Sequence, residues 1–236
     1  MTTEPKPYTY RIIRSAKRRT VAIHIKANEV TVRAPTTLAL AVIHRFVDQR
    51  HDWILKTLAK DRSQPVVNFQ DGALLPIGGK LTRMVLVTGS SGDIKLGGDV
   101  LIIPVSNRVK YPHRYALKQL DTWLERRATA VLSEQVFSAA NSIDCGSRLT
   151  RITYKVTRSK WGHCTHAGVI QLHPRIMMAP PEIQHYLVAH EVAHLRHMNH
   201  SGAFWETVAR LDPSYKVHRQ WLKDHQHATL LLSASD

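Results

Sequence analysis

The feature that most limits how this chain can fold is an apolar helix pattern near its C-terminal end. Residues 181–197 read PEIQHYLVAHEVAHLRH, in which Ile183, Leu187 and Leu195 recur at multiples of four residues. This spacing puts the three side chains on one face of a helix. Two prolines at 180–181 favour a helix start at this point. The segment must therefore lie as a helix against a core that other elements supply.

The same helix carries His190 and His194, which form the pattern HExxH with Glu191. Residues four apart lie above one another on a helix, so both imidazoles can converge on one metal ion. Chance gives this pattern roughly 0.03 times in a chain of this composition. Zinc suits a nitrogen-rich site and lowers the pKa of a bound water, whose proton the Glu191 carboxylate can take. The sequence therefore predicts a zinc site with Glu191 as general base.

A third ligand must come from beyond the helix, and two candidates stay open. His200 lies six residues after His194, where the chain should turn back, and it is the preferred ligand. Glu206 on the following segment is the alternative. His197 fits poorly because it lies about 60° round the helix from His194, and we expect it to support the ligands instead.

The rest of the chain predicts strands, then helices. Apolar and polar residues alternate in the strands, whereas apolar residues recur at three- and four-residue steps in the helices. Pro112 and Ser201 are expected to begin two of the helices. The expected elements are a hairpin at 20–33, a helix at 38–60, a small antiparallel sheet within 71–105, a helix from 112 to about 140, a strand hairpin formed by 150–157 and 168–173, and helices starting at 201 and 214.

This order favours an α+β architecture. We expect an N-terminal β-rich region with one helix at 1–108 and a catalytic region at 109–236. No stretch is long and apolar enough for a membrane span, and the start lacks a secretory pattern, so we expect a cytoplasmic protein without membrane contact. Cys145 and Cys164 are too few for a disulfide framework, and in this compartment they should be free thiols.

Positive charge is in large excess, with 33 Lys and Arg against 18 Asp and Glu. Such an excess favours anionic partners, among them nucleic acid, nucleotides and acidic protein surfaces. The densest run consists of Arg11, Arg14, Lys17, Arg18 and Arg19. Runs of this kind are also common on ordinary solvated faces, so the sequence leaves both interpretations open.

Two motifs carry a family likeness. The segments RSKWGHC at 158–164 and HEVAHLRHMNHSGAFW at 190–205 resemble the YgjP-like metal-dependent hydrolases, which belong to the wider zincin group and are related in their core to SprT-like and WLM domains. The likeness extends over roughly residues 10–225. It implies zinc at the three histidines, catalysis by the glutamate, and an active-site helix under a small sheet. His163 departs from the small, Ser-like residue usual in the family.

The likeness also implies where a substrate would bind. The strand pair around 152–173 would lie above the active-site helix and pair with extended substrate backbone. Arg158, Lys160 and Trp161 would border the cleft, and Tyr215 could donate a hydrogen bond to a developing oxyanion.

Three functions are therefore weighed, and a metallopeptidase acting on peptide or protein is preferred. The second is a nucleoside-triphosphate pyrophosphatase of the UTP type, an activity also attached to the family. The stretch around the motif is poor in acids, which weighs against it because phosphoryl-transfer sites usually collect carboxylates for Mg²⁺. The third is a nucleic-acid-associated zinc protein that uses its basic surface.

Overall fold

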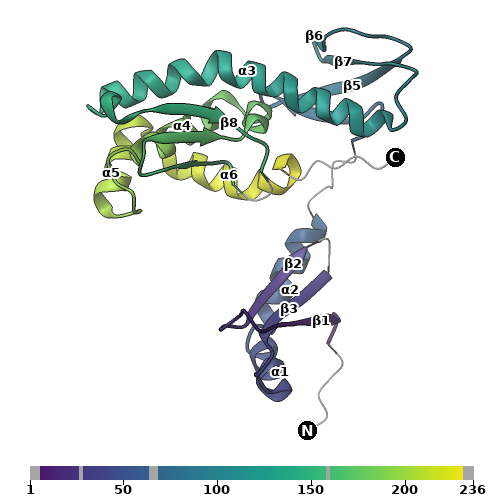
Figure 1. Cartoon of the computed structure of the whole chain (residues 1–236), viewed down its shortest axis with the longest axis vertical. Helices are drawn as coiled ribbons and strands as arrows, with labels where there is room; N and C mark the ends of the chain where they lie inside the picture. The colour runs from purple at the N-terminus through teal and green to yellow at the C-terminus, as the bar shows by residue number, and fades with distance from the viewer. Residues whose placement is uncertain (1–5, 27–28, 64–68, 158–159, 231–236) are drawn as a thin grey trace. The chain divides into compact units, whose positions relative to one another are not determined.

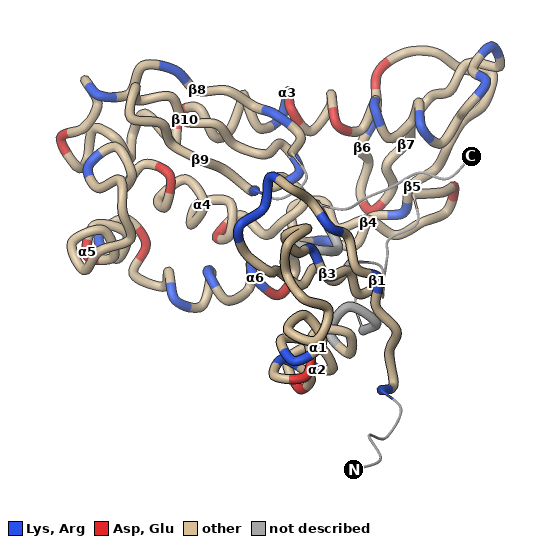
Figure 2. The backbone as a smooth tube through the Cα atoms, turned by 60° about the horizontal axis from the view of Figure 1, so that its bottom comes forward, with Lys and Arg blue, Asp and Glu red and all other residues tan. Residues whose placement is uncertain are grey.

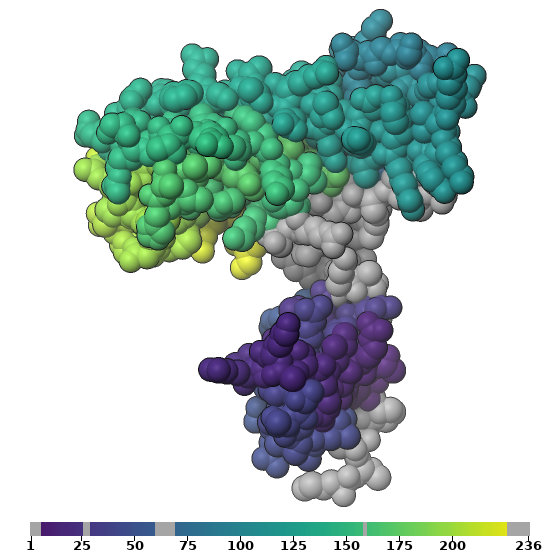
Figure 3. All heavy atoms as spheres, viewed as in Figure 1, coloured from purple at the N-terminus to yellow at the C-terminus, as the bar shows by residue number. Residues whose placement is uncertain are grey.

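Two separate hydrophobic cores divide the chain into two units, residues 1–65 and 66–236. The computed structural model describes residues 6–26, 29–63, 69–157 and 160–230 (Figure 1). In the space-filling view the side chains of each unit pack into a body of their own (Figure 3). Among the described residues, no helix has the length and apolar character needed to cross a membrane.

Unit 1 begins with a three-stranded sheet of strand order β1-β3-β2. Strands β2 (Ala22–Lys26) and β3 (Glu29–Pro35) pair antiparallel, which confirms the predicted hairpin. Strand β1 (Tyr10–Ser15) pairs parallel with β3 on its other side. The sheet buries the alternating side chains Val30, Val32 and Ala34 on one face.

Two helices cover this buried face, α1 (Leu40–Asp48) and α2 (His51–Ser63), where the sequence predicts one helix at 38–60. The chain turns between them at Gln49 and Arg50. A straight helix over the expected 23 residues would be about 35 Å long, whereas the longest strand of this sheet has 7 residues and spans about 23 Å. Breaking the helix lets both halves bury their apolar side chains on the same small sheet, namely Ile43, Val47, Ile54 and Leu58.

Unit 2 opens with a four-stranded sheet of strand order β4-β5-β7-β6. Its strands are β4 (Leu74–Ile77), β5 (Lys80–Thr88), β6 (Lys95–Gly97) and β7 (Val100–Val105). The expected all-antiparallel sheet is wrong at one pair, because β5 and β7 run parallel. Strand β6 lies between them in the sequence and pairs antiparallel with the far edge of β7, so β7 runs in the direction of β5.

Helix α3 (Pro112–Ser142) confirms the long helix predicted from Pro112. Its buried residues recur every four positions and form one unbroken stripe. The boundary expected near residue 108 lies inside unit 2, whose core contains Val105 of β7 together with this stripe. The stripe consists of Ala116, Leu120, Leu124, Ala128, Leu132, Val136 and Ala140.

A second sheet of unit 2 has the strand order β8-β10-β9. The hairpin expected between β8 (Arg151–Tyr154) and β10 (Val169–Leu172) is wrong, because these strands pair parallel. The antiparallel partner of β10 is β9 (Gly162–Cys164), which comes between them in the sequence. The chain therefore reverses direction before β9 and again after it, so that β10 runs parallel to β8. Strand β9 forms one edge of the sheet.

Helices complete unit 2 and confirm the α+β class. After the short 3₁₀ helices η1 (Gly146–Arg148) and η2 (Pro174–Met178) come α4 (Pro181–Ala193), α5 (Gly202–Leu211) and α6 (Tyr215–Leu230). Helix α4 packs against α3, α5, α6 and β9, so it lies near the middle of the unit. Nine of its thirteen residues are buried, which explains why its sequence is apolar on more than one face.

Candidate metal centre

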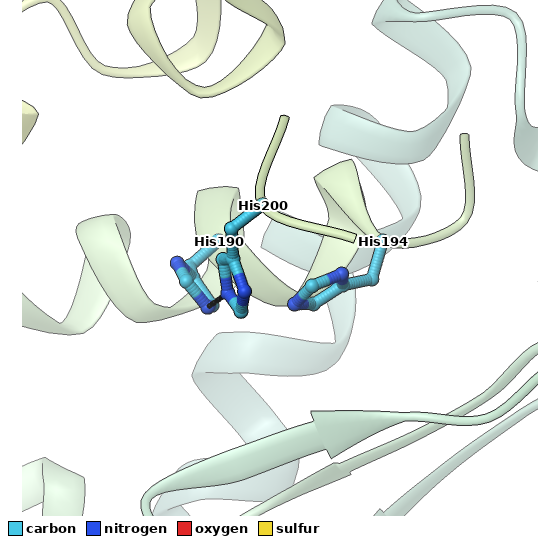
Figure 4. Close-up of side chains that lie close together, drawn as sticks. All are labelled: His190, His194 and His200. Atoms are coloured by element: carbon cyan, nitrogen blue, oxygen red, sulfur yellow. Dashed lines mark hydrogen bonds between the residues drawn. The ribbon is translucent and has the colours of Figure 1, made fainter. Parts of the chain in front are cut away.

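Three imidazoles meet where α4 ends and α5 begins (Figure 4). His190 lies in the last turn of α4, His194 follows directly as its C-cap with helical dihedrals, and His200 lies just before α5. The Nε2 atoms of His190 and His200 are 3.2 Å apart, and one nitrogen from each of the three rings lies within 4.8 Å of the others. Within the described parts of the chain, no other group of three His, Cys, Asp or Glu side chains converges in this way. Glu206 is exposed and is not part of the group.

The donor set fits a zinc ion. Two nitrogens bound to a tetrahedral zinc at about 2.0–2.1 Å lie about 3.3 Å from each other, which is close to the observed separation. The Nδ1–H of His194 donates to the backbone carbonyl of His197 at 3.0 Å, which leaves Nε2 of His194 as the ligand atom. Burial lowers the pKa of His190 to about 3 and also lowers that of His194, so both rings keep a free lone pair at neutral pH.

The ring of Phe204 packs against all three histidine rings. Its ring centroid lies 5.1 Å from that of His190, 4.5 Å from His194 and 4.7 Å from His200, and the side chain is fully buried. The Oγ of Ser201 accepts a hydrogen bond from the Phe204 backbone amide at 3.4 Å, which confirms the predicted N-cap. The sequence did not predict this role of Phe204, although its place in the HSGAFW motif was a signal for it.

Glu191, next to His190 on α4, points toward strand β9. Its side chain is 4% exposed, and Oε2 is buried without a hydrogen-bond partner among the described residues. A Cβ added to Gly162 would lie 2.7 Å from Oε1 of Glu191, so the backbone of β9 passes directly over the carboxylate. Burial raises the pKa of Glu191 to about 8, and the charge of Lys160 opposes this shift. Sequence reasoning did not identify the contribution of Gly162.

The residues expected to bind substrate lie in different environments. Lys160 is exposed and close enough to Glu191 to act on its charge. Trp161 is only 8% exposed and belongs to the core of unit 2, with its ring edge against His173. Arg158 lies outside the described residues. Contact of these three side chains with substrate stays a prediction.

His173 holds the segment that leads into β9. Its Nε2–H donates to the carbonyl of Thr157 at 3.1 Å, and its Nδ1 accepts from the backbone amide of Arg175 at 3.1 Å. The hydroxyl of Thr157 in turn donates to the carbonyl of Lys160 at 2.7 Å. The guanidinium of Arg175 forms two hydrogen bonds with Asp121 of α3, at 2.7 and 2.9 Å. The backbone over Glu191 is thus anchored to the long helix.

An aromatic stack borders the centre on the α5 and α6 side. The Trp205 ring stacks on His200 with centroids 5.6 Å apart and on Tyr215 with centroids 5.5 Å apart. The Arg219 guanidinium lies 4.6 Å from the Trp205 centroid, and its charge contributes to the lowered pKa of His190. Tyr215 is therefore one ring removed from the histidines, and its role toward an oxyanion stays a prediction. Arg219 belongs to no motif, so its position beside the centre was not predictable from the sequence.

Comparison with protein families agrees with this geometry. The family model described as YgjP-like, metallopeptidase domain matches residues 19–225, which span both units and all three histidines. A search of the curated proteins found no match. His163, where the sequence departs from the family pattern, lies in β9 opposite Gln171. Because the match extends over most of the chain, the protein belongs to the YgjP-like family of metallopeptidase domains.

Proposed function

We propose that the protein is a zinc-dependent peptidase in which Glu191 acts as general base. The observation that carries this proposal is the convergence of three imidazoles beside a buried carboxylate, in a chain that belongs to a metallopeptidase family. A bound zinc ion would polarise the substrate carbonyl and make a water at the site a stronger nucleophile near neutral pH.

The side chains around the centre support the proton transfers that peptide hydrolysis needs. Oε2 of Glu191 has no other partner among the described residues, so it can accept a proton from the attacking water and pass it to the leaving amine. The Lys160 ammonium balances negative charge on this carboxylate. On the other side we expect Tyr215 or Arg219 to donate hydrogen bonds to the developing oxyanion.

The edge position of β9 favours an extended peptide as substrate. Strand β9 pairs only with β10 within its sheet, which leaves the backbone groups of its outer edge for another strand. An extended chain added to such an edge gains main-chain hydrogen bonds over several residues. Since Gly162 of β9 also passes over Glu191, a peptide paired with this edge would run next to the general base.

Nucleotide hydrolysis is the competing function, because Lys160 and Arg219 put two cations near the centre. An enzyme that handles triphosphates usually binds Mg²⁺ through several carboxylates. In the described portion of the chain, the one group of metal-ligating side chains consists of histidines alone. We therefore prefer the peptidase and keep the nucleotide as a second arm of the test.

The test compares zinc-loaded wild type with Glu191→Gln on an unfolded protein substrate and on UTP. We expect the wild type to cleave the protein, and the variant to lose on the order of 100-fold or more in rate while it still binds about one zinc per chain. Glu206→Gln, which changes an exposed glutamate, is the matched control and should cleave like wild type. Pyrophosphate release that depends on Glu191, without protein cleavage, would replace the peptidase with the nucleotide hydrolase.

The cellular location is also a proposal. Neither Cys145 nor Cys164 forms a disulfide, and free thiols are usual in the reducing cytoplasm. We propose that the enzyme works there, which fractionation of cells that express the tagged protein would test.

A further inference from the structure

Unit 1 is strongly basic for its size. Residues 1–65 contain 13 Lys and Arg but only 5 Asp and Glu, so about half of the net charge lies in just over a quarter of the chain. None of the three histidines or Glu191 belongs to this unit. We propose that unit 1 binds the phosphate backbone of nucleic acid, using one end and the open face of the sheet β1-β3-β2.

The sheet topology gathers the positive charges at one end. Strands β1 and β3 are parallel and β2 is antiparallel to them, so the ends of β1 and β3 and the start of β2 lie at the same end of the sheet. The connection from β1 to β2 lies at this end of the sheet and carries a run of Lys and Arg (Figure 2). We call this end of the sheet the basic end. Its Lys and Arg residues are Arg14, Lys17, Arg18, Arg19 and Arg33.

Three acidic side chains that the structure describes in unit 1 lie away from the basic end. Glu29 begins β3 and is therefore at the opposite end of the sheet. Asp48 ends α1 and forms an ion pair with Lys6, which precedes β1. Asp52 lies in the first turn of α2, close to Asp48 along the chain. None of these three described carboxylates therefore lies at the basic end, where five Lys and Arg side chains gather.

The open face of the sheet continues this surface. The helices of the unit pack on the side that carries Val30 and Val32, so the side chains that alternate with them face away from the core. The register places Arg11, Thr31 and His24 in one row across the three strands. Arg33 lies in the next row, between Ile13 and Ala22. Two exposed arginines and two further hydrogen-bonding side chains therefore occupy neighbouring positions on this face: Arg11, Arg33, Thr31 and His24.

The chemistry of this surface fits phosphodiesters. Four of the five cations at the basic end are arginines, whose planar guanidinium can give two parallel hydrogen bonds to one phosphate. Arg14 donates to the backbone carbonyls of Thr36 and Leu38 after β3, and Arg18 donates to that of Thr20, which limits where these two side chains can move. Lys17, Arg19 and Arg33 are exposed beside them. A chain of regularly spaced phosphates can contact several such cations at once and release its counterions.

The test measures binding of full-length protein to labelled oligonucleotides of about 25 nucleotides, long enough to exceed a typical site. Fluorescence anisotropy would follow single-stranded RNA, single-stranded DNA and duplex DNA between about 50 and 200 mM salt. The basic-end variant combines Lys17→Gln, Arg19→Gln and Arg33→Gln. The matched control combines three exposed lysines of unit 2, Lys80→Gln, Lys95→Gln and Lys118→Gln, and so removes the same net charge.

We expect the basic-end variant to bind at least about 10-fold more weakly and to reduce the slope of log affinity against log salt by about 2 to 3. The control variant should stay within about twofold of wild type in the same assay. The three nucleic acids then show which backbone is preferred. Equal losses in both variants, no binding at low salt, or tighter binding to polyglutamate or to anionic vesicles would overturn the proposal. Glu191→Gln should bind like wild type, which separates this inference from the peptidase.

Discussion

The backbone of Gly162 lies directly against the carboxylate of Glu191. A Cβ at position 162 would come within 2.7 Å of Oε1 and 2.9 Å of Cδ, closer than side-chain carbons approach their neighbours in folded proteins. The dihedrals of Gly162 are not in the left-handed region, so the constraint is one of space and not of backbone conformation. The glycine of the RSKWG segment therefore lets strand β9 cover Glu191, the proposed general base.

Gly162→Ala should disable the enzyme without removing its metal. The added methyl must push Glu191 aside or lift β9, and either shift takes the carboxylate out of reach of its water. We expect kcat/KM to fall by about 100-fold or more, with zinc content unchanged by elemental analysis. Gly202→Ala is the control, because a Cβ there meets nothing within 4 Å. Full activity of Gly162→Ala would show that the close approach has no catalytic importance.

Phe204→Leu should weaken metal binding because the ring that spaces the three imidazoles is lost. Small changes around metal ligands commonly cost about 10- to 100-fold in affinity, and we expect a loss in this range from competition with a chelator. The smaller side chain should also lower the free energy of unfolding by about 1–3 kcal/mol. Phe137→Leu is the control, since Phe137 lies on α3 and is 54% exposed. Equal metal affinities in the two variants would contradict the role given to Phe204.

His173 should make folding stability depend on pH. Burial lowers the pKa of His173 to about 4, so between pH 6.5 and 4 the unfolded chain binds a proton at this ring that the folded chain does not. Its contribution is therefore present above pH 6.5 and is lost as the pH falls toward 4, by about 3 kcal/mol at most. Urea unfolding at pH 7 and pH 4.5 should show a larger loss of stability for wild type than for His173→Gln. The same loss in both proteins would rule out this source.

Cys164 should react slowly with alkylating reagents although its side chain is partly exposed. Burial raises the pKa of its thiol to about 11, and the nearby charge of Glu191 adds to this shift. At pH 8 the reactive thiolate is then a minor species. In a Cys145→Ser background, iodoacetamide should modify the folded protein at least about 10-fold more slowly than the urea-unfolded chain. Rapid labelling of the folded protein would instead indicate an activated thiol.

The sequence predicted the parts of the site that local periodicity controls. The four-residue step from His190 to His194 needs only a helix, and His200 needs only a turn after it, so the cluster follows from the motif once the helix exists. The long helix from Pro112 was predictable for the same reason, because its apolar stripe repeats every four residues.

Pairing between strands was not predictable from alternation. Alternating side chains identify β8 and β10 as strands, but the direction of their pairing depends on β9, which has only three residues. The approach of Gly162 to Glu191 depends on the same pairing and brings together residues 29 positions apart. Tertiary packing also decided the break between α1 and α2, since the helical pattern runs through Gln49 and Arg50 without a Gly or Pro.

The two hydrophobic cores share no side chain, and this separation has a consequence for how the protein can change. A substitution that loosens Val32 or Ile54 weakens unit 1 while the packing beneath His190 and His194 keeps its own support. Heating should then melt the protein in two steps. During evolution, substitutions in residues 1–65 could change which partner unit 1 binds, and the histidines of the second unit would need no compensating substitution.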